Sequence, residues 1–430
     1  MLEYINEILS GVLLPVILLL AGVYLGWRVR FFYILHPLRL ARDIRDSAAV
    51  GGVSPMRALT VALAGTLGVG NITGVATAIA CGGPGAVFWM IVCAFLVMSV
   101  KYAEVYLSQV YRERDGTGGA MYYIKRGLSS MLGSRAAGVL AAFFAFLIAA
   151  NSLLTGSIVQ VSAATSVVGE FVPAVPPVLC GILFGALAAY ITCGGLGRVS
   201  RMTVGLIPFL SALYIIISAV CIIRSRGMIG DAVGAIVGGA FSPRAAGGGI
   251  LGFGVNSAVR FGVTRGIFSN EAGCGTAPSA HAAANAKSPH HQGCMGIFEV
   301  FADTVVLCTV TALVILTSGI TPSEDGMTSA LAAFAASGGY VSAVIVGVSV
   351  MLFAFATVIS QSYYGLGAVS YLTCGVKGRG AYVFLLAASA VAGSVIPCGV
   401  MWDVADLIIA VMTAVNTVAV MLIFGRIWKC

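Results

Sequence analysis

The stretch Thr60–Phe88, TVALAGTLGVGNITGVATAIACGGPGAVF, decides how the rest of the chain is interpreted. It is apolar enough to enter a bilayer, yet its middle carries four glycines within ten residues, Gly65, Gly68, Gly70 and Gly74. Glycine inside a helix costs about 1 kcal/mol relative to alanine, so this density marks a place where the helix loosens. At membrane depth, irregular backbone survives only where it is buried in protein or lines a cavity. The stretch therefore predicts a broken transmembrane helix whose break binds a small polar molecule.

The composition places the whole chain in a membrane. Of its 430 residues, 59% are hydrophobic and only 9% are charged, whereas about 25% charged residues is usual for soluble domains. The net charge of +8 does not indicate nucleic-acid binding, because basic residues collect in the cytoplasmic loops of membrane proteins. The eleven scattered cysteines show no CxxC spacing. Neither disulfides nor a transition-metal site is therefore predicted.

Apolar runs of about twenty residues predict an all-α membrane protein with about eleven transmembrane helices. The first run, roughly Ile8–Trp27, is interpreted as a retained span and not as a signal peptide. The arginines that follow it alternate with aromatic and aliphatic residues, which predicts an amphipathic segment along the membrane surface. The other predicted spans are approximately 55–81, 86–110, 136–167, 177–192, 203–223, 252–285, 296–320, 343–372, 382–396 and 404–424.

The predicted spans form two halves. Residues 1–54 hold an extra N-terminal span and the amphipathic connection, and residues 55–223 form a first five-helix repeat. An external Gly-rich connection, 224–249, leads to a second five-helix repeat and a short cytoplasmic tail at 250–430. Because five is odd, the halves must have opposite orientations, which predicts a 5+5 inverted repeat. Each half begins with a Gly-interrupted segment, at 65–74 and 269–278, and such matched breaks point to the binding site of a transporter.

The distribution of lysine and arginine predicts the orientation. Seventeen of these residues fall in the loops after spans one, three, five, seven and nine or in the C-terminal tail. Only Arg224, Arg226 and Arg244 fall in the opposite loops. The positive-inside rule then places the N-terminus outside and the C-terminus in the cytoplasm of a cell membrane.

The backbone groups freed at the first break have two predicted uses. Amides at the start of the outer half-helix suit a carboxylate, because a helix N-terminus carries a partial positive charge. Carbonyls at the end of the inner half-helix suit a small hard cation. The residues expected to bind substrate here are Thr66, Gly68, Val69, Gly70 and Asn71, and those expected to bind the cation are Ala64 and Leu67.

An alternative for the same stretch is close helix packing through Gly70-xxx-Gly74. A dinucleotide-binding loop is excluded, because the third glycine of GxGxxG and a βαβ pattern are both missing.

The second break concentrates polar residues at membrane depth, where such residues are usually functional or paired. Ser269 and Asn270 are expected to contact substrate, and Asn270 and Glu271 are plausible partners for an ammonium group. Alternatively, Arg265 and Glu271 neutralise each other. His281 is expected to be structural.

Four polar positions in other spans are further candidates. Gln160 is an amide in an apolar helix and needs a partner, either a neighbouring helix or the substrate. Thr357 and Ser360 lie three residues apart on one helical face. Their hydroxyls are expected either to add oxygens to the cation site or to bond between helices. Gln361 follows as a second buried amide.

The remaining intramembrane charges have structural and functional interpretations. Lys101 and Glu104, three residues apart, are predicted to pair. Asp303 is a candidate for proton relay, and Asp406 is expected at a solvated interface. No GxSxG, HExxH or GxxxxGK[ST] motif occurs, so an enzyme is not expected.

Together these segments resemble the alanine or glycine:cation symporter family, also called sodium:alanine symporters, within the amino acid–polyamine–organocation transporter superfamily. The resemblance rests on GVGNITGVATAIACGGPGAVFWM from Gly68, KYAEVYL from Lys101, YYIKRGL from Tyr122, RGIFSNEAGCGTAPSAHAAA from Arg265 and DTVVLCTVTALVIL from Asp303. It implies an eleven-span form of the inverted-repeat fold of neurotransmitter:sodium symporters.

The resemblance also implies sodium-driven uptake of small neutral amino acids. It implies a substrate site made by the first break, Gln160, the second break with Phe268, and the span that contains Gln361. The sodium site would combine the carbonyls of Ala64 and Leu67 with the region of Thr357. Sodium is the only metal expected, and no cofactor is expected besides this coupling ion.

Some residues differ from the family pattern. Ser157 and Ser162 stand where family members tend to have asparagines, Gln361 where they tend to have tryptophan, and Leu366 where they tend to have glutamate. The smaller and more polar Gln361 is expected to change the wall of the pocket and with it the choice of amino acid.

The expected function is sodium-coupled symport of a small neutral amino acid, such as alanine or glycine, by alternating access. The expected partners are the amino acid, sodium and the lipid bilayer, without nucleic acid or an obligate protein partner. The alternatives are a proton-coupled or altered-cargo transporter of the same fold and, more remotely, a membrane sensor that does not transport.

Overall fold

The computed structural model describes residues 8–47, 52–241, 257–323, 325–375, 377–396 and 398–428, with the backbone alone for 398–403. The predicted start of the second interrupted segment at residue 252, and the loop residue Arg244, lie outside this part of the chain. Regular structure in the described part is helical, and Val53 and Ala284 form an isolated parallel bridge.

Seven continuous helical segments of the described chain are long and apolar enough to cross a membrane. They are η1–α2 (Leu9–Arg28), α7 (Gly85–Val110), α9–η3–α10 (Ser134–Phe171), α12 (Gly195–Arg224), α18–η5–α19 (Pro289–Thr317), α21 (Tyr340–Leu372) and the Val404–Ile427 part of α23 (Cys398–Ile427).

Four further segments complete the set of predicted spans. The pair α5 (Pro55–Thr66) and η2–α6 (Val69–Gly82) passes the same test as one span bent by 61°. Two shorter apolar helices are α11 (Pro177–Thr192) and α22 (Arg379–Val395). The second interrupted segment holds α16 (Ser257–Asn270) and α17 (Pro278–Ala282). Each predicted span has its counterpart here, and the predicted all-α membrane fold is confirmed.

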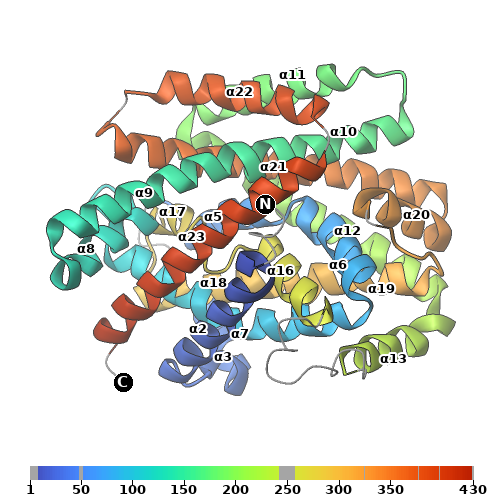
Figure 1. Cartoon of the computed structure of the whole chain (residues 1–430), viewed down its shortest axis with the longest axis horizontal. Helices are drawn as coiled ribbons and strands as arrows, with labels where there is room; N and C mark the ends of the chain where they lie inside the picture. The colour runs from blue at the N-terminus through green and yellow to red at the C-terminus, as the bar shows by residue number, and fades with distance from the viewer. Residues whose placement is uncertain are drawn as a thin grey trace.

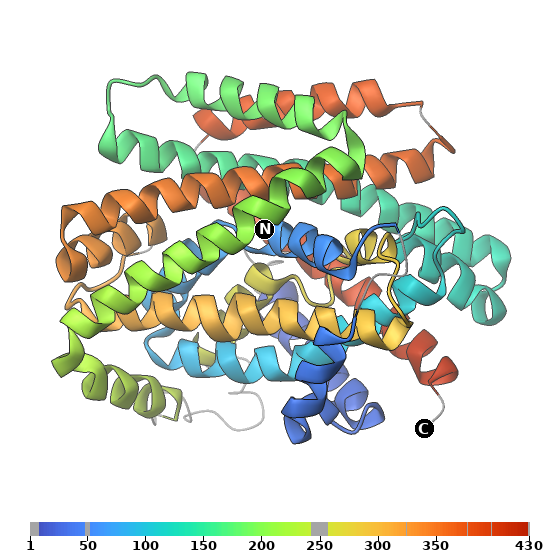
Figure 2. The ribbon, with the colours of Figure 1, turned by 180° about the vertical axis from the view of Figure 1, so that it is seen from behind.

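The helices form layers that are visible from both sides of the molecule (Figures 1 and 2). At one edge α11 and α22 lie side by side, and the next layer contains α21 packed against α9 and α10. At the opposite edge α7 packs against α2 and α18. The broken helices lie between these layers, so the structure surrounds both breaks with protein.

The two breaks face each other in this central region, because α16 packs against α6 and α17 packs against α5. After α16 the chain leaves helical geometry at Glu271, where φ is +49°, and at Gly273 and Gly275, where φ is +88° and +75°. Left-handed backbone is easy for glycine and unfavourable for glutamate, so the conformation of Glu271 must be held by its surroundings.

Several helices do not span and were not assigned by the sequence analysis. They are α8 (Ala120–Leu132), α13 (Ile229–Ala240) and α20 (Gly326–Gly338). The predicted surface segment after the first span is present as α3 (Phe32–Leu35) and α4 (Pro37–Arg45), and no residue of α4 is buried.

Candidate functional site

The first break places Gly68 between two other spans. Helix α5 ends at Thr66, Gly68 has extended backbone, and the 3₁₀ turn η2 (Val69–Asn71) then leads into α6. A β-carbon on Gly68 would lie 2.7 Å from Gln160 Oε1 and 2.8 Å from Thr357 Oγ1. Both separations are too short for real atoms, so only glycine lets the three segments approach in this way.

Gln160 reaches the break from the first position of α10 (Gln160–Phe171), directly after the π-helical segment η3 (Leu154–Val159). Its Oε1 accepts a hydrogen bond from the Val69 amide at 3.2 Å, and its Nε2 donates to the Thr155 carbonyl at 3.3 Å. The Gln160 side chain is buried, so the partner that a buried amide requires is backbone from the first break and from its own helix.

The proposed cation residues lie on the other side of Gly68. Thr357 Oγ1 is 3.5 Å from the Leu67 carbonyl oxygen, while Ser360 Oγ donates to the Val61 carbonyl at 2.6 Å. Ala64, on the same helix α5, is fully buried. The structure thus brings Thr357 to the freed carbonyl of Leu67. The hydroxyl of Ser360 instead bonds to the Val61 carbonyl, which lies six residues before Leu67.

The second break is held by a carboxylate from α7. Glu104 accepts hydrogen bonds from the amides of Gly273 at 3.1 Å and Gly275 at 3.0 Å. The Asn416 amide donates to the same carboxylate and to the Gly273 carbonyl, the latter at 2.8 Å. Glu104 therefore satisfies backbone donors that would otherwise be buried and unpaired.

The predicted pair of Lys101 and Glu104 is wrong. Lys101 Nζ instead lies 3.2 Å from Glu299 Oε1, and both side chains are fully buried. His281 Nε2 lies 3.1 Å from the other oxygen of Glu299, and Gln292 is 2.6 Å from His281 Nδ1. His281 thus belongs to a buried polar network, as the sequence analysis expected.

A short chain of hydrogen bonds joins the two breaks. Gln361 Nε2 donates to Glu271 Oε1 at 2.7 Å and is 3.3 Å from the Gly65 carbonyl oxygen. The second carboxylate oxygen of Glu271 accepts from Thr276. Glu271 is therefore not neutralised by Arg265, whose guanidinium lies 3.4 Å from Asp406.

Asp303 is a buried carboxylate that joins the two breaks on the side of α6 and α16. Its Oδ1 accepts from Asn71 Nδ2 at 2.7 Å, and its Oδ2 accepts from Ser269 at 2.7 Å and from Thr304 at 2.8 Å. Asn270 Nδ2 donates to Thr304 at 3.0 Å. The sequence analysis assigned Asn71, Ser269 and Asn270 to the substrate site but assigned Asp303 only a possible proton relay.

Two buried acceptor oxygens at the junction have no partner in the part of the chain that the structure describes. They are Asn71 Oδ1 and Gln361 Oε1. Beside the break lies a cavity of about 10 Å³ that Leu67, Gly68 and Asn71 help to line, enough for about one water molecule. The described conformation thus has unsatisfied oxygen atoms next to the break and little space around them.

Phe268 packs on the outer side of the first break. A β-carbon on Gly70 would lie 3.3 Å from its ring and 3.3 Å from the backbone of Ser269. At Gly74, in contrast, a β-carbon would meet nothing within 4 Å. The alternative of close helix packing through glycine is therefore supported at Gly70 and is not supported at Gly74.

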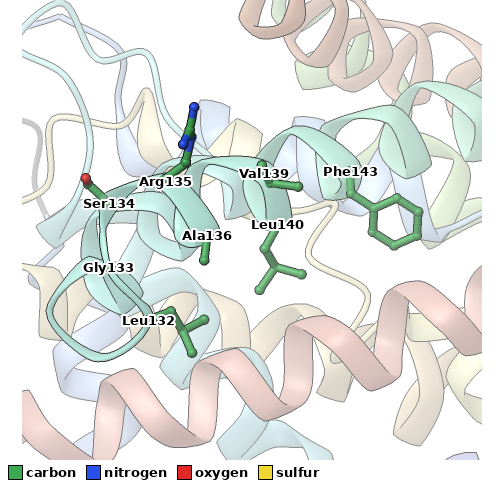
Figure 3. Close-up of a pocket in the computed structure, with 8 residues that line it drawn as sticks. All are labelled: Leu132, Gly133, Ser134, Arg135, Ala136, Val139, Leu140 and Phe143. Carbon is green, nitrogen blue, oxygen red and sulfur yellow. The ribbon is translucent and has the colours of Figure 1, made fainter.

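A much larger hollow lies elsewhere, at the turn between α8 and α9 (Figure 3). Its volume is about 840 Å³, and apolar side chains such as Leu132, Val139 and Phe143 line it beside Arg135. The hollow is open and shares no lining residue with either break. It is therefore not the polar site that the breaks form.

Two interrupted helices that face each other, buried polar residues at both breaks and seven membrane-length apolar helices in the described chain define a secondary transporter of the inverted-repeat class. The sodium:alanine symporter family model matches residues 1–430, and the chain belongs to that family.

Relatives and solved structures agree with this assignment. The sodium/alanine symporter AgcS of Methanococcus maripaludis is 34% identical, with 98% of this chain and 94% of the relative covered. The probable sodium/glutamine symporter GlnT of Bacillus subtilis is 33% identical, covering 97% and 87%. The crystal structure of MhsT in complex with L-phenylalanine matches with a TM-score of 0.63 at 14% identity, covering 88% and 91%, which shows the shared fold.

Proposed function

We propose that this protein takes up a small neutral amino acid, such as alanine or glycine, together with sodium by alternating access. The observation that carries the proposal is the position of Gly68, with Gln160 on one side and Thr357 on the other. This position separates two kinds of freed backbone group at one break. Amides at the start of the outer half-helix suit the substrate carboxylate, and the Leu67 carbonyl suits sodium.

The substrate ammonium group would use the oxygens that lack partners. Asn71 Oδ1 and Gln361 Oε1 are buried acceptors near the two breaks, and an ammonium group has three N–H donors. Phe268, packed against Gly70, limits the space for a side chain. A small amino acid fits these features better than a bulky one, provided that the site widens from the described conformation.

Coupling to sodium supplies enough free energy for uptake. One positive charge that moves inward through 100 mV contributes roughly 2.3 kcal/mol. A tenfold sodium gradient adds about 1.4 kcal/mol. Together they support a substrate gradient of several hundredfold with one sodium ion per amino acid.

The direct test is uptake of radiolabelled alanine into proteoliposomes that contain the purified protein. An inward sodium gradient with a negative interior should produce accumulation, and replacement of sodium by choline should abolish it. Equal accumulation in choline would overturn sodium coupling. Unlabelled glycine, serine and larger amino acids, added as competitors in the same assay, rank the substrates.

A second candidate is a transporter with the same coupling and a more polar cargo. Gln361 favours this candidate, because it presents an unpaired amide oxygen at the junction of the breaks. A relative at 33% identity has the name of a sodium/glutamine symporter. Stronger competition by glutamine or serine than by alanine would favour the second candidate over the first.

We infer that the N-terminus lies outside and the C-terminus in the cytoplasm of a cell membrane. The support is the excess of lysine and arginine in one set of loops.

A further inference from the structure

Away from both breaks, three side chains that commonly bind metals meet where surface helix α4 lies against the start of α18. Asp43 comes from α4, whereas His290 and Cys294 lie four residues apart on α18 and so share one helical face. One ligand atom from each residue lies within 4.8 Å of the other two. Transport through the two breaks gives these three groups no role.

The separations fit tetrahedral coordination. His290 Nε2 is 3.2 Å from Asp43 Oδ2 and 3.8 Å from Cys294 Sγ. A zinc ion bound by nitrogen and oxygen at about 2.1 Å and by sulfur at about 2.3 Å requires N···O near 3.4 Å and N···S near 3.6 Å. The observed values differ from these by only about 0.2 Å. The third pair, the Asp43 oxygen and the Cys294 sulfur, lies within 4.8 Å, so side-chain movements of about 1 Å would close the site around an ion.

The surroundings orient the histidine toward the other two ligands. Its second ring nitrogen, Nδ1, lies 2.7 Å from the hydroxyl of Tyr102, a fully buried residue. The ring of Phe32 packs at 5.5 Å from the ring of His290 and adds an apolar wall. A polar partner on the far nitrogen and an apolar shell are the usual supports of a metal-binding histidine.

The charges also suit a divalent ion. Bound zinc would meet the carboxylate of Asp43, the thiolate of Cys294 and neutral His290, so the two negative ligands balance the ion. The exposed Arg39, whose Nε lies 3.8 Å from Asp43 Oδ2, would turn away from the carboxylate when the ion binds. Cys294 is fully buried, while the side chains of Asp43 and His290 are 19% and 28% exposed. The partly exposed side gives the ion a path from water and leaves room for a water molecule as fourth ligand.

We propose that Asp43, His290 and Cys294 form a binding site for a zinc-like divalent metal ion that fastens α4 to α18. Binding would release the thiol proton of Cys294 to solvent. With Nε2 bound to the ion, the ring proton of neutral His290 would be on Nδ1 and point to the oxygen of Tyr102. The absence of CxxC led the sequence analysis to expect no transition-metal site, but the His290–Cys294 spacing and the distant Asp43 make a different type of site.

The bound ion would connect the surface helix α4 to helices that lie next to the first break. Helix α18 packs against α4, against α7 and against α5, the inner half of the first broken helix. An ion that fastens α4 to α18 therefore restrains a helix next to the first break. Its presence should raise the thermal stability of the protein.

Cobalt(II) is the most informative probe, because thiolate ligation gives it a charge-transfer band and tetrahedral geometry strengthens its visible bands. The titration uses full-length protein without a polyhistidine tag, in detergent. Cys193 and Cys374, both exposed, are first replaced by serine to remove competing thiols. One cobalt ion per chain with a thiolate band, displaced by zinc, is the expected result.

Variants separate the proposed site from adventitious binding. Cys294→Ser should remove the thiolate band, and Asp43→Asn, on a helix without buried residues, should weaken binding at least about tenfold. Tyr102→Phe should weaken binding by a similar factor, because it removes the partner of His290 Nδ1. The matched control is His291→Gln, since His291 Nδ1 is paired with Ser288, and it should bind cobalt like the parent protein.

Two results would overturn the proposal. One is a parent protein that binds no stoichiometric cobalt. The other is unchanged cobalt binding in both Cys294→Ser and Asp43→Asn. Residues outside the proposed site would then bind the ion. The thermal midpoint of the parent protein, with and without zinc, gives an independent readout of the link between α4 and α18.

Discussion

Gln160 Oε1 accepts a hydrogen bond from the backbone amide of Val69 at 3.2 Å. A side chain of one span thus pairs with an amide that the break in another span has freed. The two residues lie 91 positions apart in the sequence. The bond fixes the start of η2–α6 relative to α10, and it does so through a side chain buried from solvent. Any movement of α10 during alternating access must therefore either carry the break with it or exchange this bond for one to the substrate.

Replacing Gln160 by leucine should strongly impair transport. Leucine has a similar size but accepts no hydrogen bond, so the buried Val69 amide would lose its acceptor at a cost of about 1–3 kcal/mol. Alanine uptake in proteoliposomes should fall by about 5-fold to 150-fold at subsaturating substrate, because each 1.36 kcal/mol corresponds to a factor of about ten in rate. The control is Thr165→Val, because the hydroxyl of Thr165 donates within its own helix, to the Val161 carbonyl, and has no other partner among the described residues. Equal uptake by Gln160→Leu and the parent would show that the bond has no role.

Two glycines of the same stretch should respond oppositely to alanine. In Gly68→Ala the new methyl group would lie 2.7 Å from Gln160 and 2.8 Å from Thr357, so both contacts of the break must shift. In Gly74→Ala the methyl group meets nothing within 4 Å, and alanine stabilises a helix by up to about 1 kcal/mol over glycine. Uptake should be lost in the first variant and kept in the second. A comparable loss in both would indicate that Gly74 has a contact absent from this conformation.

The sequence was sufficient for the spans and for the breaks, because both depend on local properties. Apolar length sets the spans, and glycine density set the position of the first break within Thr60–Phe88. The partner of a side chain depends on which helices pack against each other in the fold. A local sequence pattern does not carry that information. Lys101 and Glu104 are neighbours on one helix, yet their partners, Glu299 and the amides of the second break, lie far along the chain.

The same limit explains the residues that sequence analysis missed. Asp303 could be recognised as an intramembrane charge, but its contacts to Asn71 and Ser269 come from packing between the two halves. Asp43 and His290 are 247 residues apart, so no spacing rule connects them. Helices such as α13 and α20 were missed because they are too short to give a span-length apolar run.

Glu104 should be essential for the stability of the second break. It accepts from two buried amides, those of Gly273 and Gly275, and each would be left without a partner in Glu104→Leu. With about 1–3 kcal/mol for each unsatisfied group, the loss is at least about 2 kcal/mol. Thermal unfolding in detergent should show a clear drop for the leucine variant and a smaller one for Glu104→Gln, which keeps one acceptor oxygen. A drop of the same size in both variants would show that one acceptor oxygen is not enough and that the break needs the whole carboxylate.

Labelling of two exposed thiols tests the proposed orientation. Cys193 follows α11 and Cys374 follows α21, and both are exposed. Both loops belong to the Lys- and Arg-rich set, so a membrane-impermeant maleimide should leave them unlabelled on intact cells and label them after permeabilisation. A cysteine introduced at Arg226, in an opposite loop, is the positive control for outside labelling. Labelling of Cys193 and Cys374 on intact cells would reverse the orientation.

The two hydroxyls of α21 should differ in their effect on sodium dependence. Thr357 Oγ1 lies 3.5 Å from the Leu67 carbonyl at the break, so Thr357→Val would remove one of the oxygens available to the ion. The sodium concentration for half-maximal uptake should then rise about tenfold, which corresponds to about 1.4 kcal/mol. Ser360 donates instead to the Val61 carbonyl at 2.6 Å, so Ser360→Ala should change protein stability more than sodium affinity. Sodium curves for both variants, measured at saturating alanine, separate the two roles. If Ser360→Ala shifts the sodium curve as far as Thr357→Val does, Ser360 must exchange its partner on α5 for the ion when sodium binds.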